Sequence, residues 1–232
     1  GDADAELQVI ANVTEEDTAA IQDYLDRTPM EITCPETPCL LDIKLTGWLG
    51  GHSACVRVAN NHTNIIYMAR DGQVLKELPV NGNAEDHLQN KSVLNVKDII
   101  TFAETIPIDV IRPTVGRQIE KNTAIAAEGL RNSWGANIGS TLLQGGTDWA
   151  TQARAWAAAG SDARMNGCEM PVVIVSGSGN QGITASVPVW KYGKLMGADD
   201  DTILRAVCLS DLITIHQKTG IGRLSAYCGA VS

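Results

Sequence analysis

The first half of the chain combines short apolar runs with one amphipathic helical pattern. Thr14 is a typical N-cap residue, and acidic residues fill the positions directly after it. Ile21, Tyr24 and Leu25 then recur at helical spacing, so the sequence predicts a helix over residues 14–27. Short apolar runs that predict β-strands cover residues 7–10, 30–33, 40–45, 54–58 and 65–69.

A β-hairpin is predicted where Asp71-Gly72 lies between two apolar runs. The Asp-Gly pair favours a type I′ turn, whose backbone twist matches that of the strands it joins. Together with the predicted strands, this hairpin makes residues 1–108 a small sheet-containing domain with helices packed on it.

Residues 109–232 are predicted to form a second, mainly helical domain, which gives the chain an α+β fold. The pairs Ile106-Pro107 and Arg112-Pro113 mark the boundary, because a residue before proline avoids the helical region. Helical patterns on either side of this boundary cover residues 96–105, 147–159 and 200–219.

The chain is acidic, with a formal net charge of −9 and an isoelectric point near 4.9. Phosphate binding needs clustered lysine and arginine, so we expect no nucleic-acid partner, and an anionic membrane surface is also disfavoured. No apolar run approaches the roughly 18 residues of a membrane helix, and no secretory signal is visible. The sequence therefore predicts a cytoplasmic protein with a small substrate.

The six cysteines include no CxxC pair, which favours a reducing compartment where single cysteines are usually small buried residues. Cys34 and Cys39 have a loose spacing for zinc, and no second pair of ligands follows at a suitable distance. A turn with two incidental cysteines is therefore the better interpretation of this pair. Core packing is the expected role of Cys208 and His216.

The most informative stretch runs from Ser176 to Gly182 and reads Ser-Gly-Ser-Gly-Asn-Gln-Gly. Its glycines expose backbone N–H groups to a carboxylate or phosphate, and Asn180 and Gln181 add side-chain donors and acceptors. The spacing matches neither a dinucleotide-binding fingerprint nor a Walker A loop. From the residues alone, a binding loop and a glycine-rich helix breaker explain the stretch equally well.

Two shorter stretches carry candidate chemistry. His62 precedes Thr63 and Asn64 just before a predicted strand, and it suits proton transfer or polarisation of a carboxylate. A simple turn also explains these residues. Cys228 is flanked by small residues that would let its thiolate approach a metal or cluster, whereas a buried free cysteine is the simpler interpretation.

Taken together, these stretches resemble the L-cysteine desulfidases and their relatives, a group that is similar to the α-chains of iron–sulfur L-serine dehydratases. The resemblance runs along the whole chain, and the Ser176–Gly182 loop is its most specific part. It rests on the following motifs: Ser161-Asp162-Ala163-Arg164-Met165, the loop continuing into Ile183-Thr184-Ala185, His62-Thr63-Asn64, Trp134-Gly135 with Ile138-Gly139, and Arg223-Leu224-Ser225-Ala226 with Cys228.

The resemblance implies a [4Fe–4S] cluster with one open iron site that acts as a Lewis acid. A base would remove the α-proton, the β-substituent would leave as hydrogen sulfide or water, and the product would hydrolyse to pyruvate and ammonia. By position, Cys228 corresponds to a cluster ligand. The positions that correspond to the substrate site are His62, Thr63, Asn64, Ser176, Gly177, Ser178, Gly179, Asn180 and Gln181.

Members of this family are longer at both ends, and the additional segments carry the cysteine base and the other two cluster ligands. We therefore expect the chain to be inactive alone. It would be a fragment, a split subunit that needs the missing segments as a separate chain, or a degenerate relative. L-cysteine is the expected substrate, and L-serine dehydration is the alternative. A non-catalytic domain without a cluster is a third interpretation. We also expect a homo-oligomer.

Overall fold

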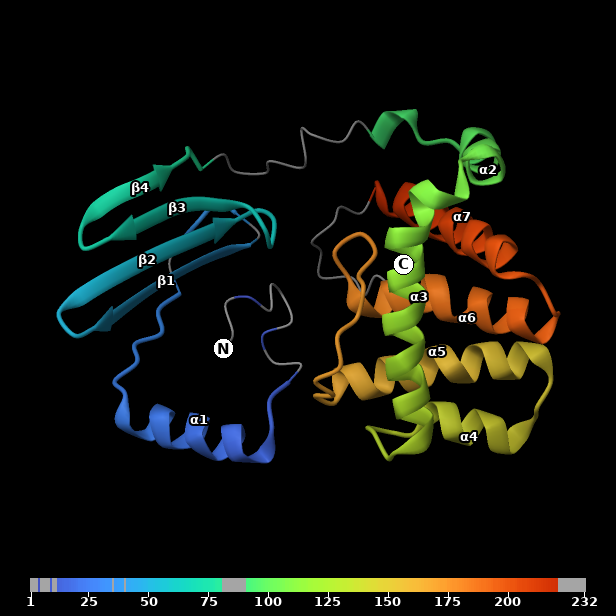
Figure 1. Ribbon diagram of the computed structural model, residues 1–232, viewed down its shortest axis with the longest axis horizontal. Helices are drawn as coiled ribbons and strands as arrows, with labels where there is room; N and C mark the ends of the chain where they lie inside the picture. Colours follow the sequence, from blue (N-terminus) through green and yellow to red (C-terminus); the bar gives the residue numbers. More distant parts are fainter. Residues whose placement is uncertain are drawn as a thin grey trace. The chain divides into compact units, whose positions relative to one another are not determined.

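The computed structural model describes residues 4, 9, 12–34, 36–39, 41–80 and 91–220. The chain forms two compact units, one of residues 29–90 and one of residues 1–28 together with 91–232. The first unit contains a sheet and the second is helical, which confirms the predicted α+β fold (Figure 1). This division differs in position from the one predicted at residue 108.

The sheet is an antiparallel meander whose strands follow one another in the order β1-β2-β3-β4. Asp71 and Gly72 join the last two strands with φ angles of 49° and 79°. A type I′ turn requires positive values at both residues, so the predicted hairpin is confirmed. The strands are β1 (Asp42–Leu49), β2 (His52–Ala59), β3 (Ile65–Arg70) and β4 (Gln73–Glu77).

The strand predicted at residues 30–33 is wrong, whereas the strand at 7–10 includes residues outside the described part of the chain. Residues 30–33 find no partner strand, and Ile32 remains 93% exposed. A short apolar run does not make a strand unless another strand satisfies its backbone groups. The small core of the sheet unit consists instead of Cys39, Ala59 and Ile66.

An ion pair between neighbouring strands reinforces the sheet. Arg57 on β2 donates two hydrogen bonds to Asp42 on β1, at 2.8 and 2.6 Å. The Arg57 guanidinium lowers the pKa of Asp42 to about 2, and a hydrogen bond from Thr37 acts in the same direction. Asp42 therefore remains ionised across the physiological pH range.

The predicted helices are all present. Thr14 caps the first of them through a reciprocal capping box with Asp17, as its position predicts. The helices are α1 (Glu15–Arg27), α2 (Val96–Thr105), α3 (Ile108–Arg131), α4 (Ile138–Gly145), α5 (Trp149–Met165), α6 (Gly179–Leu195) and α7 (Asp200–Lys218), with a short 3-10 turn η2 (Lys91–Val93).

The prolines of the predicted boundary behave differently from each other. Pro107 stands immediately before α3, as predicted, but Pro113 lies inside that helix and does not interrupt it. A proline in a helix removes one backbone hydrogen bond. Ile111 and Val115 flank Pro113 and are buried against α7, so tertiary packing maintains the helix across the proline.

The helical unit is a layer of four helices crossed by a fifth. Helices α4, α5, α6 and α7 lie side by side in that order, α3 runs across them, and α2 packs on α7 (Figure 1). The crossing is tight at Gly129, where a Cβ atom would lie 2.1 Å from the backbone oxygen of Ala159. Helix α5 is accordingly built from small buried residues such as Ala155 and Ala163.

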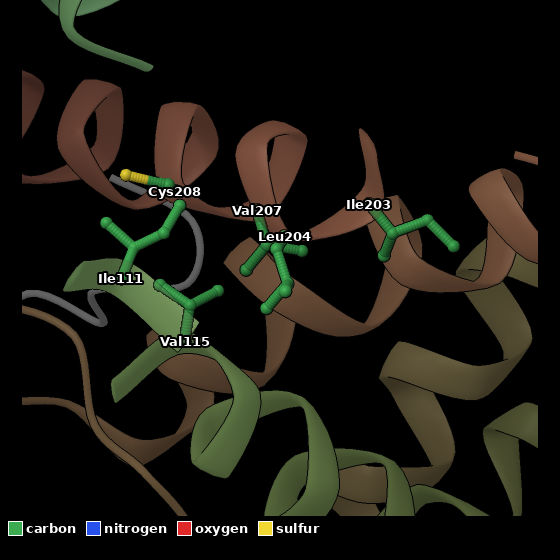
Figure 2. Packing of buried hydrophobic residues seen from close by; sticks show 6 residues of the cluster. All are labelled: Ile111, Val115, Ile203, Leu204, Val207 and Cys208. Carbon is green, nitrogen blue, oxygen red and sulfur yellow. The ribbon is translucent and has the colours of Figure 1, made fainter. Parts of the chain in front are cut away.

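Two apolar clusters hold the helical unit together. Ile111 and Val115 of α3 contact Ile203, Leu204, Val207 and Cys208 of α7 (Figure 2). The second cluster consists of Ile125, Ala126, Ala163, Ile183 and Val187 from α3, α5 and α6. Cys208 is therefore a core residue, as predicted. Within the described residues, no helix is long and apolar enough to span a membrane.

The substitution Gly129→Ala is expected to destabilise the protein by about 2–3 kcal/mol, because its methyl group would force α3 away from the α5 backbone. Gly116→Ala on the same helix is a matched control, since its Cβ would lie 4.0 Å from Leu204. The control should be neutral or stabilising by up to about 1 kcal/mol, because alanine favours the helix. Urea denaturation of both variants tests this, and equal effects would contradict it.

Candidate functional site

The glycine-rich stretch forms a tight turn that leads into α6. Ser176 and Gly177 both have positive φ angles, of 47° and 84°. Val175 and Ser178 then exchange two backbone hydrogen bonds of 3.1 Å, which close the turn. Ser178 is the N-cap of α6, and its hydroxyl accepts a hydrogen bond from the backbone N–H of Gln181. The remaining predicted residues of the loop, Gly179, Asn180 and Gln181, are the first residues of the helix.

This helix start is suited to an anion. The first backbone N–H groups of a helix have no partner within the helix, and the helix dipole adds partial positive charge there. Helix α6 is 17 residues long and has no acidic residue in its first turn. A carboxylate at this position would therefore be stabilised by the backbone itself.

Two cationic side chains border the turn. Arg164 at the end of α5 donates a hydrogen bond of 3.2 Å to the Asn180 side chain, and its guanidinium packs directly on Gly179. Lys218 in the last turn of α7 is only 4% exposed and donates to the Ser176 carbonyl at 3.1 Å. Lys218 thus stabilises the left-handed backbone at Ser176, and both cations add positive potential beside the helix start.

A buried polar network holds the start of α6 against the preceding segment. Asn122 of α3 is fully buried, accepts from the backbone N–H of Val173 at 2.8 Å and donates to its carbonyl at 3.1 Å. Asn122 also donates to Ser186 of α6. Gly182 completes the contact, since a Cβ there would lie 2.0 Å from the Val173 oxygen. The turn is therefore built on a rigid support.

Asp211 on α7 is a buried carboxyl group near the start of α6. Its carboxylate accepts a hydrogen bond of 2.9 Å from Gln118, a buried residue of α3 that also donates to the Gly182 carbonyl at 3.4 Å. Burial raises the pKa of Asp211 to about 6, although the hydrogen bond from Gln118 acts in the opposite direction. The protein therefore keeps a carboxyl group in a position where ionisation destabilises the fold.

The His62-Thr63-Asn64 stretch forms the turn between β2 and β3. His62 and Thr63 are exposed, whereas the Asn64 side chain donates to the Ala59 carbonyl at 2.9 Å and fixes the turn. The stretch belongs to the sheet unit and the glycine-rich turn belongs to the helical unit. Since the structure describes each unit by itself, an approach of His62 to the turn stays a prediction.

The cysteines are placed as follows. Cys34 is exposed and Cys39 is buried, while burial raises the thiol pKa of both Cys168 and Cys208. Cys228, the predicted cluster ligand, lies outside the described residues. Within the described residues, no three His, Cys, Asp or Glu side chains lie together in a way that would hold a metal ion. The described residues alone therefore supply no ligand set for a cluster.

Sequence reasoning missed four polar residues around the start of α6: Gln118, Arg164, Lys218 and Asp211. Arg164 belongs to the Ser161–Met165 motif, but that motif alone indicates no role for it. Lys218 and Asp211 are seven residues apart on α7 and therefore lie on one face of the helix. This spacing is the sequence signal that could have related them to each other. Nothing in the local sequence indicates that this face is buried.

The substitution Asp211→Asn is expected to stabilise the protein at about pH 8 and not at about pH 4. The folded-state pKa of about 6 lies above the usual 3.8, so ionisation begins to destabilise the fold as the pH rises above about 4. The full effect, about 1–3 kcal/mol, is reached above about pH 6.

Urea denaturation across this pH range measures the effect. Asp109→Asn is the control, because the Asp109 side chain is 93% exposed and should show no pH-dependent gain. A gain in Asp211→Asn that is equal at both pH values would contradict the assignment.

Comparison with known proteins identifies the family to which the chain is similar. A family model described as "Serine dehydratase alpha chain" matches residues 4–232. Similar curated proteins are UPF0597 proteins from Lachnoclostridium phytofermentans, 47% identical, and Treponema denticola, 41% identical. Each alignment covers 100% of this chain and 56% of the relative, so the chain spans about half the length of these proteins. No solved structure matches the chain significantly.

Proposed function

Because the chain belongs to the serine dehydratase alpha chain family, we propose that it forms part of an amino-acid lyase that releases the β-substituent of its substrate. The proposed substrate is L-cysteine, which would give hydrogen sulfide, ammonia and pyruvate. The observation that carries this proposal is the turn at the start of α6, with two bordering cations and no acidic residue in the first turn of the helix.

The substrate carboxylate is proposed to bind at this turn. The N–H groups of Gly179 and Asn180 in the first turn of α6 would donate to it, and the Arg164 guanidinium would add charge from the side of α5. Lys218 would act through the backbone, because its hydrogen bond to the Ser176 carbonyl maintains the strained conformation of the turn. Ser176 and Ser178 present hydroxyl groups on either side of Gly177.

The sheet unit is proposed to contribute the proton-handling group. His62 is exposed on the β2–β3 turn and has a side chain that can hold or move a proton. Asn64 fixes the backbone of that turn through its bond to Ala59, so His62 and Thr63 would be presented by a rigid hairpin.

The proposed cofactor is a [4Fe–4S] cluster, which would supply Lewis-acid chemistry at the β-substituent when bound. Cys228 is the proposed ligand from this chain, and the other ligands would come from the segments present in the longer relatives. We propose that those segments are supplied by a separate chain and that the assembly is a homo-oligomer. The proposed location is the reducing cytoplasm, where an oxygen-sensitive cluster persists.

L-serine is the second candidate substrate, and the description of the matching family favours it. Both reactions would use the same carboxylate site and yield pyruvate and ammonia. They differ only in the group released, sulfide or water, so an assay of sulfide together with pyruvate distinguishes them.

The test uses the native protein purified without oxygen and assayed with L-cysteine and L-serine. Arg164→Met is expected to lower kcat/KM by about 10–100-fold, because a charge-assisted contact to the carboxylate is lost. Arg154→Met is the matched control on the same helix, since Arg154 is exposed and bonds only within α5. The control should remain within about twofold of the unaltered protein.

Two outcomes would count against this proposal. Equal losses in the two arginine variants would remove Arg164 from the substrate site. If the iron-loaded native protein released pyruvate from neither amino acid, the lyase proposal would give way to a non-catalytic role.

A further inference from the structure

One buried acceptor at the start of α6 has no partner. Gln181 is only 3% exposed, and its side-chain oxygen Oε1 makes no hydrogen bond to any group in the described part of the chain. Nearly all buried polar atoms in proteins are paired, because an unpaired one costs the desolvation energy of the group. An unpaired oxygen at the turn that is proposed to bind the substrate therefore points to a donor supplied by a ligand.

The local sequence would allow Gln181 to be satisfied within the chain. A serine N-cap followed three residues later by glutamine can form a capping box, in which the glutamine oxygen accepts from the N-cap N–H. Here only half of the box forms, since the Ser178 N–H donates instead to the Val175 carbonyl at 3.1 Å. The closed turn at Ser176 and Gly177 thus leaves the glutamine oxygen without its usual partner.

The position of Gln181 relates this oxygen to the end of α6 that is proposed to bind the carboxylate. Side chains on a helix lean toward its N-terminus, so the amide of a residue in the first turn lies over the preceding turn. By this rule the Gln181 amide is expected over Ser176–Ser178, the turn that Lys218 contacts from α7. The Gln181 oxygen, which can accept from a cationic donor, and the N–H groups that can bind an anion therefore lie at the same end of α6.

We propose that Gln181 accepts a hydrogen bond from the α-ammonium group of the substrate, while the N–H groups of α6 and Arg164 bind its carboxylate. This inference rests on the proposed function and assigns the recognition of the substrate's α-amino group to one residue of this chain. A zwitterionic ligand matches the site because it carries both charges on neighbouring atoms. Gln181 is thus a residue that determines specificity.

The test compares ligands that differ only in the amine. Calorimetry on the oxygen-free native protein measures the binding of L-serine and of 3-hydroxypropionate, which lacks the amine. The unaltered protein should prefer L-serine. In Gln181→Met the affinity for L-serine should fall at least about tenfold, while the affinity for 3-hydroxypropionate stays the same, because the apolar side chain cannot accept the ammonium bond.

Stability supplies a second readout. Without ligand, Gln181→Met should raise Tm by about 2–4 °C, because an unpaired buried oxygen is replaced by a side chain of similar shape. Ser210→Ala is the matched control on the α6–α7 contact, where Ser210 donates to the Ala185 carbonyl at 2.7 Å. The control should lower Tm and leave the preference for L-serine unchanged.

The outcomes separate this inference from the lyase proposal. If Gln181→Met keeps the full preference for L-serine, the inference is wrong, while release of sulfide or pyruvate by the unaltered protein still supports the lyase. If Gln181→Met weakens the binding of L-serine but not the binding of L-alanine, the oxygen contacts the β-substituent and the inference is again wrong. If the unaltered protein binds none of L-cysteine, L-serine and L-alanine, both proposals fail.

A second variant covers a failure of Gln181→Met to fold. Gln181→Glu keeps the shape and the acceptor, so it should retain or increase the preference for L-serine over 3-hydroxypropionate. Loss of that preference in a folded Gln181→Glu protein would overturn the inference.

Discussion

The helical unit depends on the direct approach of the α3 backbone to the α5 backbone. At Gly129 there is no room for a side chain next to Ala159, and α5 presents alanines and glycine on several of its faces. Close packing of this kind leaves few alternative arrangements, because a small displacement loses many contacts at once. The positions of α6 and of the turn before it follow from this packing, since both α3 and α5 contact α6.

The polar groups around the start of α6 oppose the stability that this packing provides. Asp211 is held where its charge is costly, Gln181 keeps an unpaired oxygen, and Ser176 adopts a left-handed backbone. Each of these features destabilises the folded state, and they lie on segments that meet at one helix end. Such a concentration of unfavourable features is characteristic of a functional site in a fold that is otherwise well packed.

Much of the fold could be predicted from the sequence because local rules determine it. The Thr14 cap, the Asp71-Gly72 hairpin and the helix at residues 96–105 each depend on neighbours within a few positions. The failures at residues 30–33 and at Pro113 have the opposite cause. In the first case a partner strand was absent, and in the second the packing of α3 on α7 outweighed the lost hydrogen bond.

The local structure of the candidate site could be predicted in part for the same reason. The glycine-rich turn is visible as a motif, and its residues do form one local structure at the start of α6. Lys218, Gln118 and Asp211 come from α3 and α7, so only the tertiary arrangement shows that they belong to it. His62 lies on the β2–β3 turn of the sheet unit, and no local sequence pattern relates it to the glycine-rich turn of the helical unit.

The order of the helices also bears on how the unit folds. Helices α4 to α7 pack in the order in which they follow along the chain, so most of their contacts join segments that are close in sequence. Such local contacts form quickly, because little chain entropy is lost in closing short loops. The bond between Gln118 and Asp211 joins residues 93 positions apart. The scaffold can therefore assemble early, and the polar end of α6 is completed only when α7 reaches α3.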